Sequence, residues 1–327
     1  MPLRLIGFLW LSALLLPLAA AAQHPGLEIG GRLQPYFATS SVDSMPASAF
    51  SLRRARLELE ARVDERLSGK FQVEFAGSAP ELKDAYVRLD PWPWLGVLAG
   101  QAKRPFSRIE LSSSSRMPPV ERGVQIAGLD ALDHYRLIKA QGYAGRGLGV
   151  QLLGTFQELP LSPAVRAGLF NGPEGVAEPA ARFTLAPLRG LELGAGWSRR
   201  AFEGGSEGDA WEADLEYRPA NGRFWLAGEV AWGEFDAVAE VAFRGAQGWV
   251  SYGFPLAAGP FSRWEPSLRA SRGWLESPPA AGGLLLTPGV NLYLEGANRL
   301  MLNYDRWLGG DGSEDASSVK VLFQLFF

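Results

Sequence analysis

The chain has 327 residues, a formal net charge of -3 and a mean hydropathy of -0.03. It contains no cysteine, which excludes a disulfide scaffold. After Gln23 no stretch long enough to cross a bilayer as a helix is free of charges, so a helical membrane protein is excluded as well. The 39 glycines, 11 tryptophans and 18 phenylalanines suit a membrane β-barrel, in which each strand is half polar.

The first residues predict a secretory signal peptide. A single positive charge, Arg4, precedes an apolar run from Leu5 to Leu18, and a run of alanines ends at Ala22. This order is typical of a cleaved signal. A permanent anchor is the alternative, but the run is short for a spanning helix and lacks a stop-transfer pattern. We therefore expect a signal peptide at 1–22 and one β-barrel domain at 23–327.

The rest of the chain alternates between apolar and polar positions in segments of roughly ten residues, separated in turn by short and longer connections. This pattern predicts an all-β fold, a transmembrane antiparallel β-barrel of about sixteen strands. The predicted strands span residues 27–38, 51–63, 68–77, 82–90, 95–104, 146–157, 162–171, 178–186, 191–202, 210–219, 223–234, 244–254, 263–275, 283–295, 298–307 and 317–327.

Several segments separate into an apolar and a charged face. In 51–63, alanine and leucine alternate with Arg54, Arg56 and Glu58, and 210–219 alternates in the same way. A soluble β-sandwich would also alternate, with its apolar face inside. Because the charges are too dense for an ordinary exterior on so many strands, we place them in a water-filled lumen.

The last predicted strand has an apolar face that we expect to contact lipid. This face consists of Val319, Val321, Phe323, Leu325 and Phe327. The alternative is a buried edge strand of a soluble protein. Tryptophans near the segment ends are expected to form interfacial girdles. They are Trp92, Trp94, Trp197, Trp232, Trp274 and Trp307.

The lengths of the connections predict the orientation of the barrel. Tight turns, expected in the periplasm, lie at 64–66, 91–93, 187–190, 220–222 and 296–297. Longer connections, expected outside the cell, include 203–209, 235–243 and 308–316. A barrel of about sixteen strands encloses an aqueous channel, so transport is the expected function.

The longest connection, from Pro105 to Gly145, is the candidate for an inward-folded constriction loop. From Lys103 to Arg122 five cations stand against two acids, and Ser112–Ser115 adds four hydroxyls. Basic side chains supply positive potential while hydroxyls replace lost water, which is the chemistry of an anion filter. The alternative is a solvated surface loop whose serines give flexibility.

Five motifs follow one another in this half of the chain. They are SLRRARLELE at 51–60, KFQVEFAG at 70–77, LKDAYV at 82–87, GQAKRPFS at 100–107 and SSSR at 113–116. In order and spacing they resemble the phosphate-selective porins O and P. The similarity covers about residues 50 to 125, with a weaker echo in LFNG at 169–172.

The resemblance implies a sixteen-stranded, usually trimeric channel in which basic residues guide anions to a constriction lined by Arg, Lys, Ser and Asp. On the matching motifs, the counterparts are Arg53, Arg54, Asp84, Lys103, Ser114, Ser115 and Arg116. Arg56 from the strand pattern and Arg108 from the loop complete the predicted anion pathway. Strict alternation would turn Arg53 outward, so we expect a bulge or the strand mouth there. Acids on the later lumen faces depart from an uninterrupted arginine ladder. They are Glu192, Glu212, Asp214, Glu216 and Glu229.

We therefore predict a bacterial outer-membrane porin for passive diffusion of small anions, with phosphate or polyphosphate as candidates. The expected partners are small anionic solutes, membrane lipid and further copies in a homotrimer, with no nucleic acid, cofactor or metal. One alternative is a general or weakly selective diffusion porin. Another is a barrel with an enzymatic or structural role, although only His24 and His134 are available and no Gly-x-Ser-x-Gly elbow occurs. We expect no catalytic residue.

Overall fold

The computed structural model describes residues 26–43, 48–202, 206–236, 241–276, 282–310 and 314–327. The predicted signal peptide at 1–22 lies outside these residues. No helix among them is both long and apolar enough to cross a membrane.

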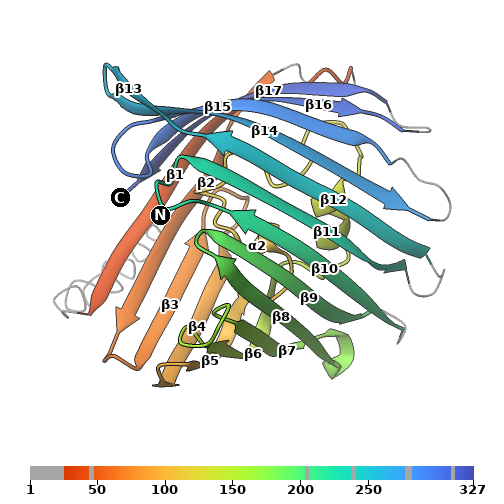
Figure 1. Cartoon of the computed structure of the whole chain (residues 1–327). Coiled ribbons are helices and arrows are strands. Elements are labelled where there is room, and N and C mark those ends of the chain that lie inside the picture. The colour runs from red at the N-terminus through yellow and green to blue at the C-terminus, as the bar shows by residue number, and fades with distance from the viewer. Residues whose placement is uncertain (1–25, 44–47, 203–205, 237–240, 277–281, 311–313) are drawn as a thin grey trace, which may run out of the picture.

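The described chain forms one antiparallel sheet that closes on itself as a barrel (Figure 1). Its strands are β1 (Leu27–Thr39), β2 (Ser48–Arg62), β3 (Leu67–Glu74), β4 (Glu81–Trp92), β5 (Leu95–Lys103), β6 (Arg146–Thr155), β7 (Ala164–Asn171), β8 (Ala177–Leu188), β9 (Leu191–Ala201), β10 (Glu207–Tyr217), β11 (Phe224–Asp236), β12 (Val241–Tyr252), β13 (Phe254–Ala258), β14 (Phe261–Leu275), β15 (Leu284–Tyr293), β16 (Arg299–Leu308) and β17 (Ala316–Phe326). Both β12 and β13 pair with β14 and are separated only by Gly253, so they form one interrupted strand. The barrel therefore has the sixteen strands predicted, and it closes where β1 pairs with β17 and β2.

The outward faces are apolar, as the alternation predicted. In β17 the side chains of Val319, Phe323 and Leu325 are exposed, and Phe327 beyond the strand end is 70% exposed. Trp92, Trp94, Trp232 and Trp274 are likewise exposed on the outer surface, but the prediction for one tryptophan was wrong. Trp307 is fully buried inside the barrel, where it packs with Val124 and Ile126 of the long loop. The position is near a strand end, but its parity on β16 turns it inward.

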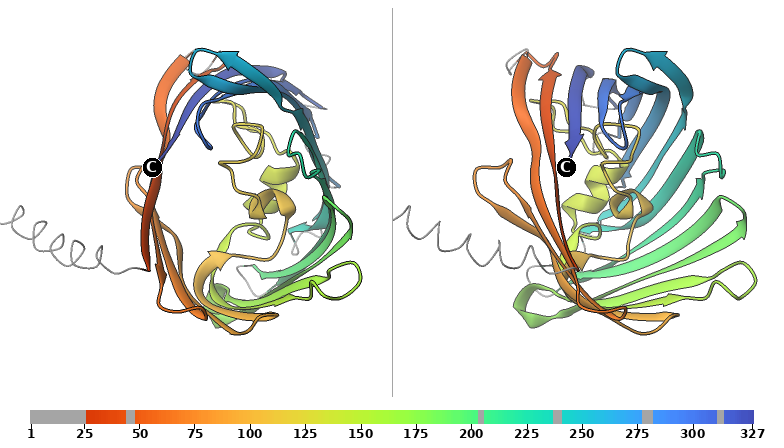
Figure 2. Two further views of the ribbon diagram at one scale, coloured as in Figure 1. Left: turned by 60° about the vertical axis from the view of Figure 1, so that its left-hand side comes forward. Right: turned by 90° about the vertical axis from the view of Figure 1, so that its left-hand side faces the viewer.

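The long loop folds into the barrel and packs against one side of the inner wall (Figure 2). It contains α2 (Arg108–Leu111) and α3 (His134–Ala140). Phe106, Leu137 and Tyr143 of the loop pack on small and aromatic side chains of β10 to β12, such as Ala210 and Phe243. Further apolar clusters join the loop to β11, β12 and β15 to β17. The protein thus has its apolar core between loop and wall, and the space beside β1 to β9 stays open.

The barrel closure generates a testable prediction at Gly31, which faces outward beneath the Phe327 ring. A side chain at Gly31 would collide with that ring, and its Cβ would stand 2.6 Å from the backbone oxygen of Arg56. We expect Gly31→Val to weaken the β17–β1–β2 closure by roughly 1–3 kcal/mol, the usual cost of overpacking. The measurement is the urea midpoint of the compact, unheated gel form.

Gly30→Ala is the matched control for this substitution. Its Cβ would meet the Phe327 backbone oxygen at 3.4 Å, which is ordinary contact. If both variants unfold at the wild-type urea concentration, the close approach at Gly31 has no energetic role.

Candidate permeation pathway

The constriction loop is held in place by the acidic faces of β9 to β11. The guanidinium of Arg108, on α2, forms ion pairs with Glu192, Asp214 and Glu216. Arg182 of β8 also contacts Asp214, at 2.5 Å. The predicted acidic lumen face therefore exists, and Arg108 of the loop and Arg182 of β8 neutralise part of it, since two guanidinium groups are shared among four carboxylates.

Glu229 on β11 provides a second anchor for the same loop. It accepts hydrogen bonds from the Ser107 hydroxyl at 2.8 Å and from the Ile109 backbone N–H at 3.0 Å. His134 Nε2 of α3 lies 2.8 Å from the Glu229 carboxylate, and both side chains are fully buried. Ser107 has a φ of 68°, a conformation that is rare for residues other than glycine. The carboxylate thus joins both loop helices to one strand.

The opposite wall, formed by β1 and β2, carries arginines toward the lumen. The register between these strands shifts between Gln34 and Pro35, so that Arg53 is an extra residue on β2. Arg53 hydrogen-bonds with Glu121 of the loop at 2.6 Å, and Arg54 donates to the hydroxyl of Ser114. The bulge expected at Arg53 is confirmed, and it turns two consecutive arginines inward.

Arg32 of β1 and Arg122 of the loop join Arg53, Arg54 and Arg56 of β2 in one basic cluster. Arg54 experiences the positive charges of the other four. Three members have a carboxylate nearby. Arg53 pairs with Glu121 at 2.5 Å, Arg56 with Glu74 at 2.6 Å and Arg122 more distantly with Glu110 at 3.8 Å. Among the described residues Arg32 and Arg54 have no such partner.

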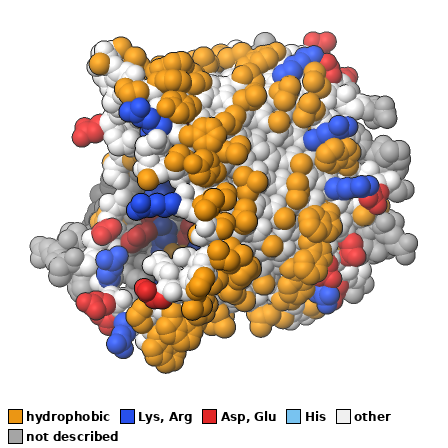
Figure 3. All heavy atoms as spheres, in the orientation of Figure 1, with side chains coloured by type: hydrophobic (Ala, Val, Ile, Leu, Met, Phe, Trp, Pro, Cys, Tyr) orange, Lys and Arg blue, Asp and Glu red, His pale blue; other side chains and the backbone are white. Residues whose placement is uncertain are grey.

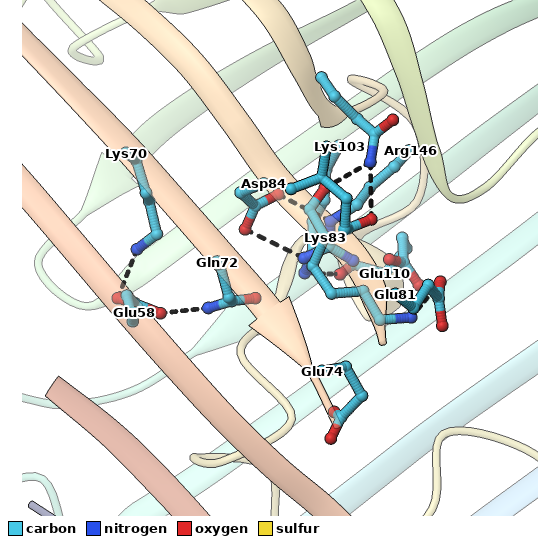
Figure 4. A network of polar contacts seen from close by, with 12 residues as sticks. Glu58, Lys70, Gln72, Glu74, Glu81, Lys83, Asp84, Lys103, Glu110 and Arg146 are labelled. Carbon is cyan, nitrogen blue, oxygen red and sulfur yellow. Dashed lines mark hydrogen bonds and ion pairs between the residues drawn. The ribbon is translucent and has the colours of Figure 1, made fainter. Parts of the chain in front are cut away.

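The other predicted pathway residues have different environments. Asp84 pairs with Arg146 at 2.7 Å, and the Lys103 ammonium bonds to the backbone oxygens at the end of α2 (Figure 4). The Ser115 hydroxyl bonds with that of Ser113 at 2.6 Å. Arg116 is exposed to the lumen, and its side chain makes no hydrogen bond or ion pair with any described residue.

Three cavities that share lining residues follow the open side of the lumen. A cavity of about 130 Å³ lies toward the long-loop end, with Arg53, Arg54 and Arg136 in its lining. Arg122 lines both this space and a cavity of about 740 Å³ at the short-turn end of β1 to β3. Arg116 lines that second space and a third of about 690 Å³ beside β6 to β10. The pathway therefore runs past the basic cluster and the loop tip.

Two buried carboxylates of the loop, Glu110 and Glu121, have pKa values below the usual range for Glu. Burial opposes ionisation of Glu121, but the charge of Arg53 and its hydrogen bonds outweigh burial and lower the pKa of Glu121 to about 2. Burial likewise opposes ionisation of Glu110, while Arg122, Lys103 and a bond from Tyr135 lower its pKa to about 2. Among the described residues no group of three or more His, Cys, Asp or Glu side chains is placed to hold a metal ion.

Sequence reasoning did not select Arg32, Arg122 or Arg146 for the pathway. The alternation of β1 was a usable signal for Arg32, since this position is inward by parity. Arg122 lies within the long loop, where no periodicity fixes the direction of a side chain, and Arg146 is the first residue of β6, directly after the loop. Their positions depend on how the loop folds back.

Comparisons with known proteins agree with this architecture. The model of the family described as phosphate-selective porin O and P matches residues 28–223. The anion-selective porin from Comamonas acidovorans is similar in structure, with a TM-score of 0.69 and 15% identity over 92% of this chain and 99% of that one. OmpT of Vibrio cholerae in its trimer form has a TM-score of 0.63 and 13% identity over 92% and 99%.

Salmonella typhi OmpF in complex with daunomycin has a TM-score of 0.62 and 11% identity, covering 91% of this chain and 97% of that one. Comparison with curated protein sequences gave no match. At such identities the structural likeness shows the fold alone, but the family model matches more than half of the chain. The fold and family indicate a channel of the bacterial outer membrane, and this chain belongs to the phosphate-selective porin O and P family.

Proposed function

We propose that this porin mediates passive diffusion of small anions and prefers them over cations. The observation that carries the proposal is an imbalance of unpaired charge along the three cavities. Among the described residues, fifteen basic side chains line the cavities against six acids. Each acid has a basic partner, although Glu58 and Glu60 share Lys70, and Glu192 and Glu216 share Arg108. These acids are Glu58, Glu60, Asp84, Glu121, Glu192 and Glu216.

Several arginines along the same path have no carboxylate partner among the described residues. They are Arg32, Arg54, Arg116, Arg136, Arg166 and Arg218. A permeating ion responds to the local potential, which the low-dielectric wall focuses, rather than to the net charge of -3. Anions are therefore favoured at each stage of the route, although the whole chain is acidic.

Arg53, Arg54, Arg56, Asp84, Lys103, Arg108, Ser114, Ser115 and Arg116 are proposed to act in two groups. Arg54, Ser114 and Arg116 contact the solute, because an unpaired guanidinium beside a hydroxyl offers donors to an oxyanion. The paired members, including Lys103 and Arg108, hold the wall and the loop in position. Phosphate and polyphosphate fit the donor chemistry, and the Comamonas neighbour described as anion-selective supports the sign of the selectivity.

Weakly selective diffusion is the second candidate, because the paired acids leave only part of the lumen electropositive. A catalytic or structural role is less well supported, since His134 is buried against Glu229 in the loop anchor. The homotrimer, the contacts with outer-membrane lipid and the signal cleavage after residue 22 are part of the same proposal. The trimer form of the similar Vibrio protein supports the assembly.

Removing the unpaired arginines tests the direction of selectivity. We expect Arg54→Gln and Arg116→Gln each to lower the chloride-to-potassium permeability ratio about two- to fivefold, since a unit charge at 4 Å contributes about 1 kcal/mol in water. Neither variant leaves an acid unpaired. The measurement is the reversal potential of single channels in a salt gradient, and the effect should shrink at 1 M salt, where the screening length is about 3 Å.

Arg306→Gln is the matched control, because Arg306 faces outward from β16 and pairs with Asp315 at 2.5 Å. A wild-type channel that prefers potassium, or variants whose reversal potential equals that of Arg306→Gln, would contradict anion selection by this path. Block of the chloride current by millimolar phosphate would favour an oxyanion site over weakly selective diffusion.

A second prediction concerns acid. Because the pKa of Glu121 is lowered from 4.5 to about 2, its stabilising effect on the loop is present in full above about pH 4.5 and is lost as the pH falls through about 2. The shift corresponds to roughly 3 kcal/mol. We expect open-channel noise to stay the same between pH 7 and pH 4 in the wild type, whereas Glu121→Gln should raise it already at pH 7. Increased wild-type noise at pH 4 would show that other groups control the loop.

A further inference from the structure

The outer face of β10 to β14 contains a groove of about 600 Å³. Gly228 pairs with Gly248, which in turn pairs with Ala270, so three adjacent strands present almost no side chain at one level. Ala246 continues this floor one outward position away, where it lies between Val230 and Arg272 in the strand register. The outward direction follows from parity, because the intervening Ala227 and Trp249 pack against the loop inside the barrel.

The groove has apolar walls. Leu193, Leu215 and Val230 border it on one side and Leu284 on the other. Figure 3 shows this face with a pale band, where the backbone is visible, between two groups of apolar side chains. The groove therefore lies within the belt that meets the hydrocarbon of the membrane.

A cation stands at the edge of the groove. Arg272 lines it and is exposed, and no described carboxylate pairs with it. Its guanidinium lies 4.8 Å from the ring centre of Trp274, the girdle residue one outward position further along β14. The neighbouring Arg244 is compensated by Glu276 at 2.8 Å. Arg272 thus has no carboxylate partner among the residues that the structure describes, whereas Arg244 has one.

We propose that the groove binds a phosphorylated lipid, with one acyl chain along its floor and the phosphate at Arg272. Methylene groups fill an apolar channel that the small side chains leave open. The phosphate supplies the charge that Arg272 lacks, beside an aromatic girdle where headgroups lie. A second barrel would instead press its apolar belt against Arg272 and leave this charge unpaired. The inference is independent of which ion crosses the channel.

Native mass spectrometry of the full chain in detergent tests this site. The probes are palmitoyl-oleoyl phosphatidylglycerol, which is anionic, and palmitoyl-oleoyl phosphatidylcholine, which is zwitterionic with the same chains. Wild type should retain the anionic lipid more strongly. Arg272→Gln should weaken that binding about fivefold, the effect of about 1 kcal/mol for one arginine near a headgroup, and leave the zwitterionic lipid unaffected. Ala246→Leu, which narrows the floor, should weaken both.

Arg306→Gln and Ala99→Leu are the matched controls, one an outward arginine and the other an exposed outward alanine away from the groove. Wild-type conductance and the compact unheated gel form in each variant exclude misfolding as the cause. Equal retention of the two lipids by wild type, or a preference that survives in Arg272→Gln, overturns the proposal. Ala246→Leu that dissociates an oligomer while retaining lipid shows that a second copy occupies the groove instead.

Discussion

The ion pairs of Arg108 with three carboxylates on β9 and β10 are the interaction on which the rest of the lumen depends. They fix α2 against the wall. Together with the bonds of Glu229 to Ser107 and Ile109, they hold the segment that follows β5 inside the barrel. Removing one partner from a buried charged cluster leaves uncompensated charge, so such a cluster specifies one position for the loop. The apolar contacts of Phe106 and Leu137 with β10 to β12 then add burial to a position that the charges have selected.

This arrangement separates charge across the lumen. Of the five lumen acids predicted on β9 to β11, four are bonded to the loop and Glu212 pairs with Arg182 of β8, so their negative potential is reduced beside the loop. The arginines of β1 and β2 face the remaining space, and Arg54 stays without a carboxylate partner among the described residues. Both walls thus bond to the loop, and the β1–β2 wall is the one on which we propose that a cation acts on solutes. The electrostatic character of the channel follows from which charges the loop neutralises, not from their total number.

The outer face obeys a different constraint, because each outward side chain meets hydrocarbon or another molecule. Large apolar residues satisfy it over most of the belt. The small residues of β11, β12 and β14 leave a depression instead, while on the inner face of β12 Trp249 packs against the loop. On these strands the outer surface is hollowed and the inner surface is covered by the loop, unlike the strands that line the open side of the lumen.

The sequence by itself determined the barrel, its strand number and the inward direction of the arginines and acids, because a period of two is a local property that survives folding. The length of one connection also located the constriction loop. The bulge at Arg53 was expected because strict alternation would turn Arg53 outward, whereas the resemblance to the family places it in the lumen. Only the tertiary structure decided which charges remain unpaired. Lys103, Arg108 and Arg116 are all cations in the same serine-rich segment. Lys103 is bonded to the loop and Arg108 to the wall, whereas the side chain of Arg116 has no partner among the described residues. For Arg108 the difference arises from a contact 106 positions away, with Asp214, and for Lys103 from the way the loop folds back onto it within nine residues. For Trp307 the alternation along β16 already indicated an inward direction, but only the tertiary structure placed Val124 and Ile126 of the loop against it.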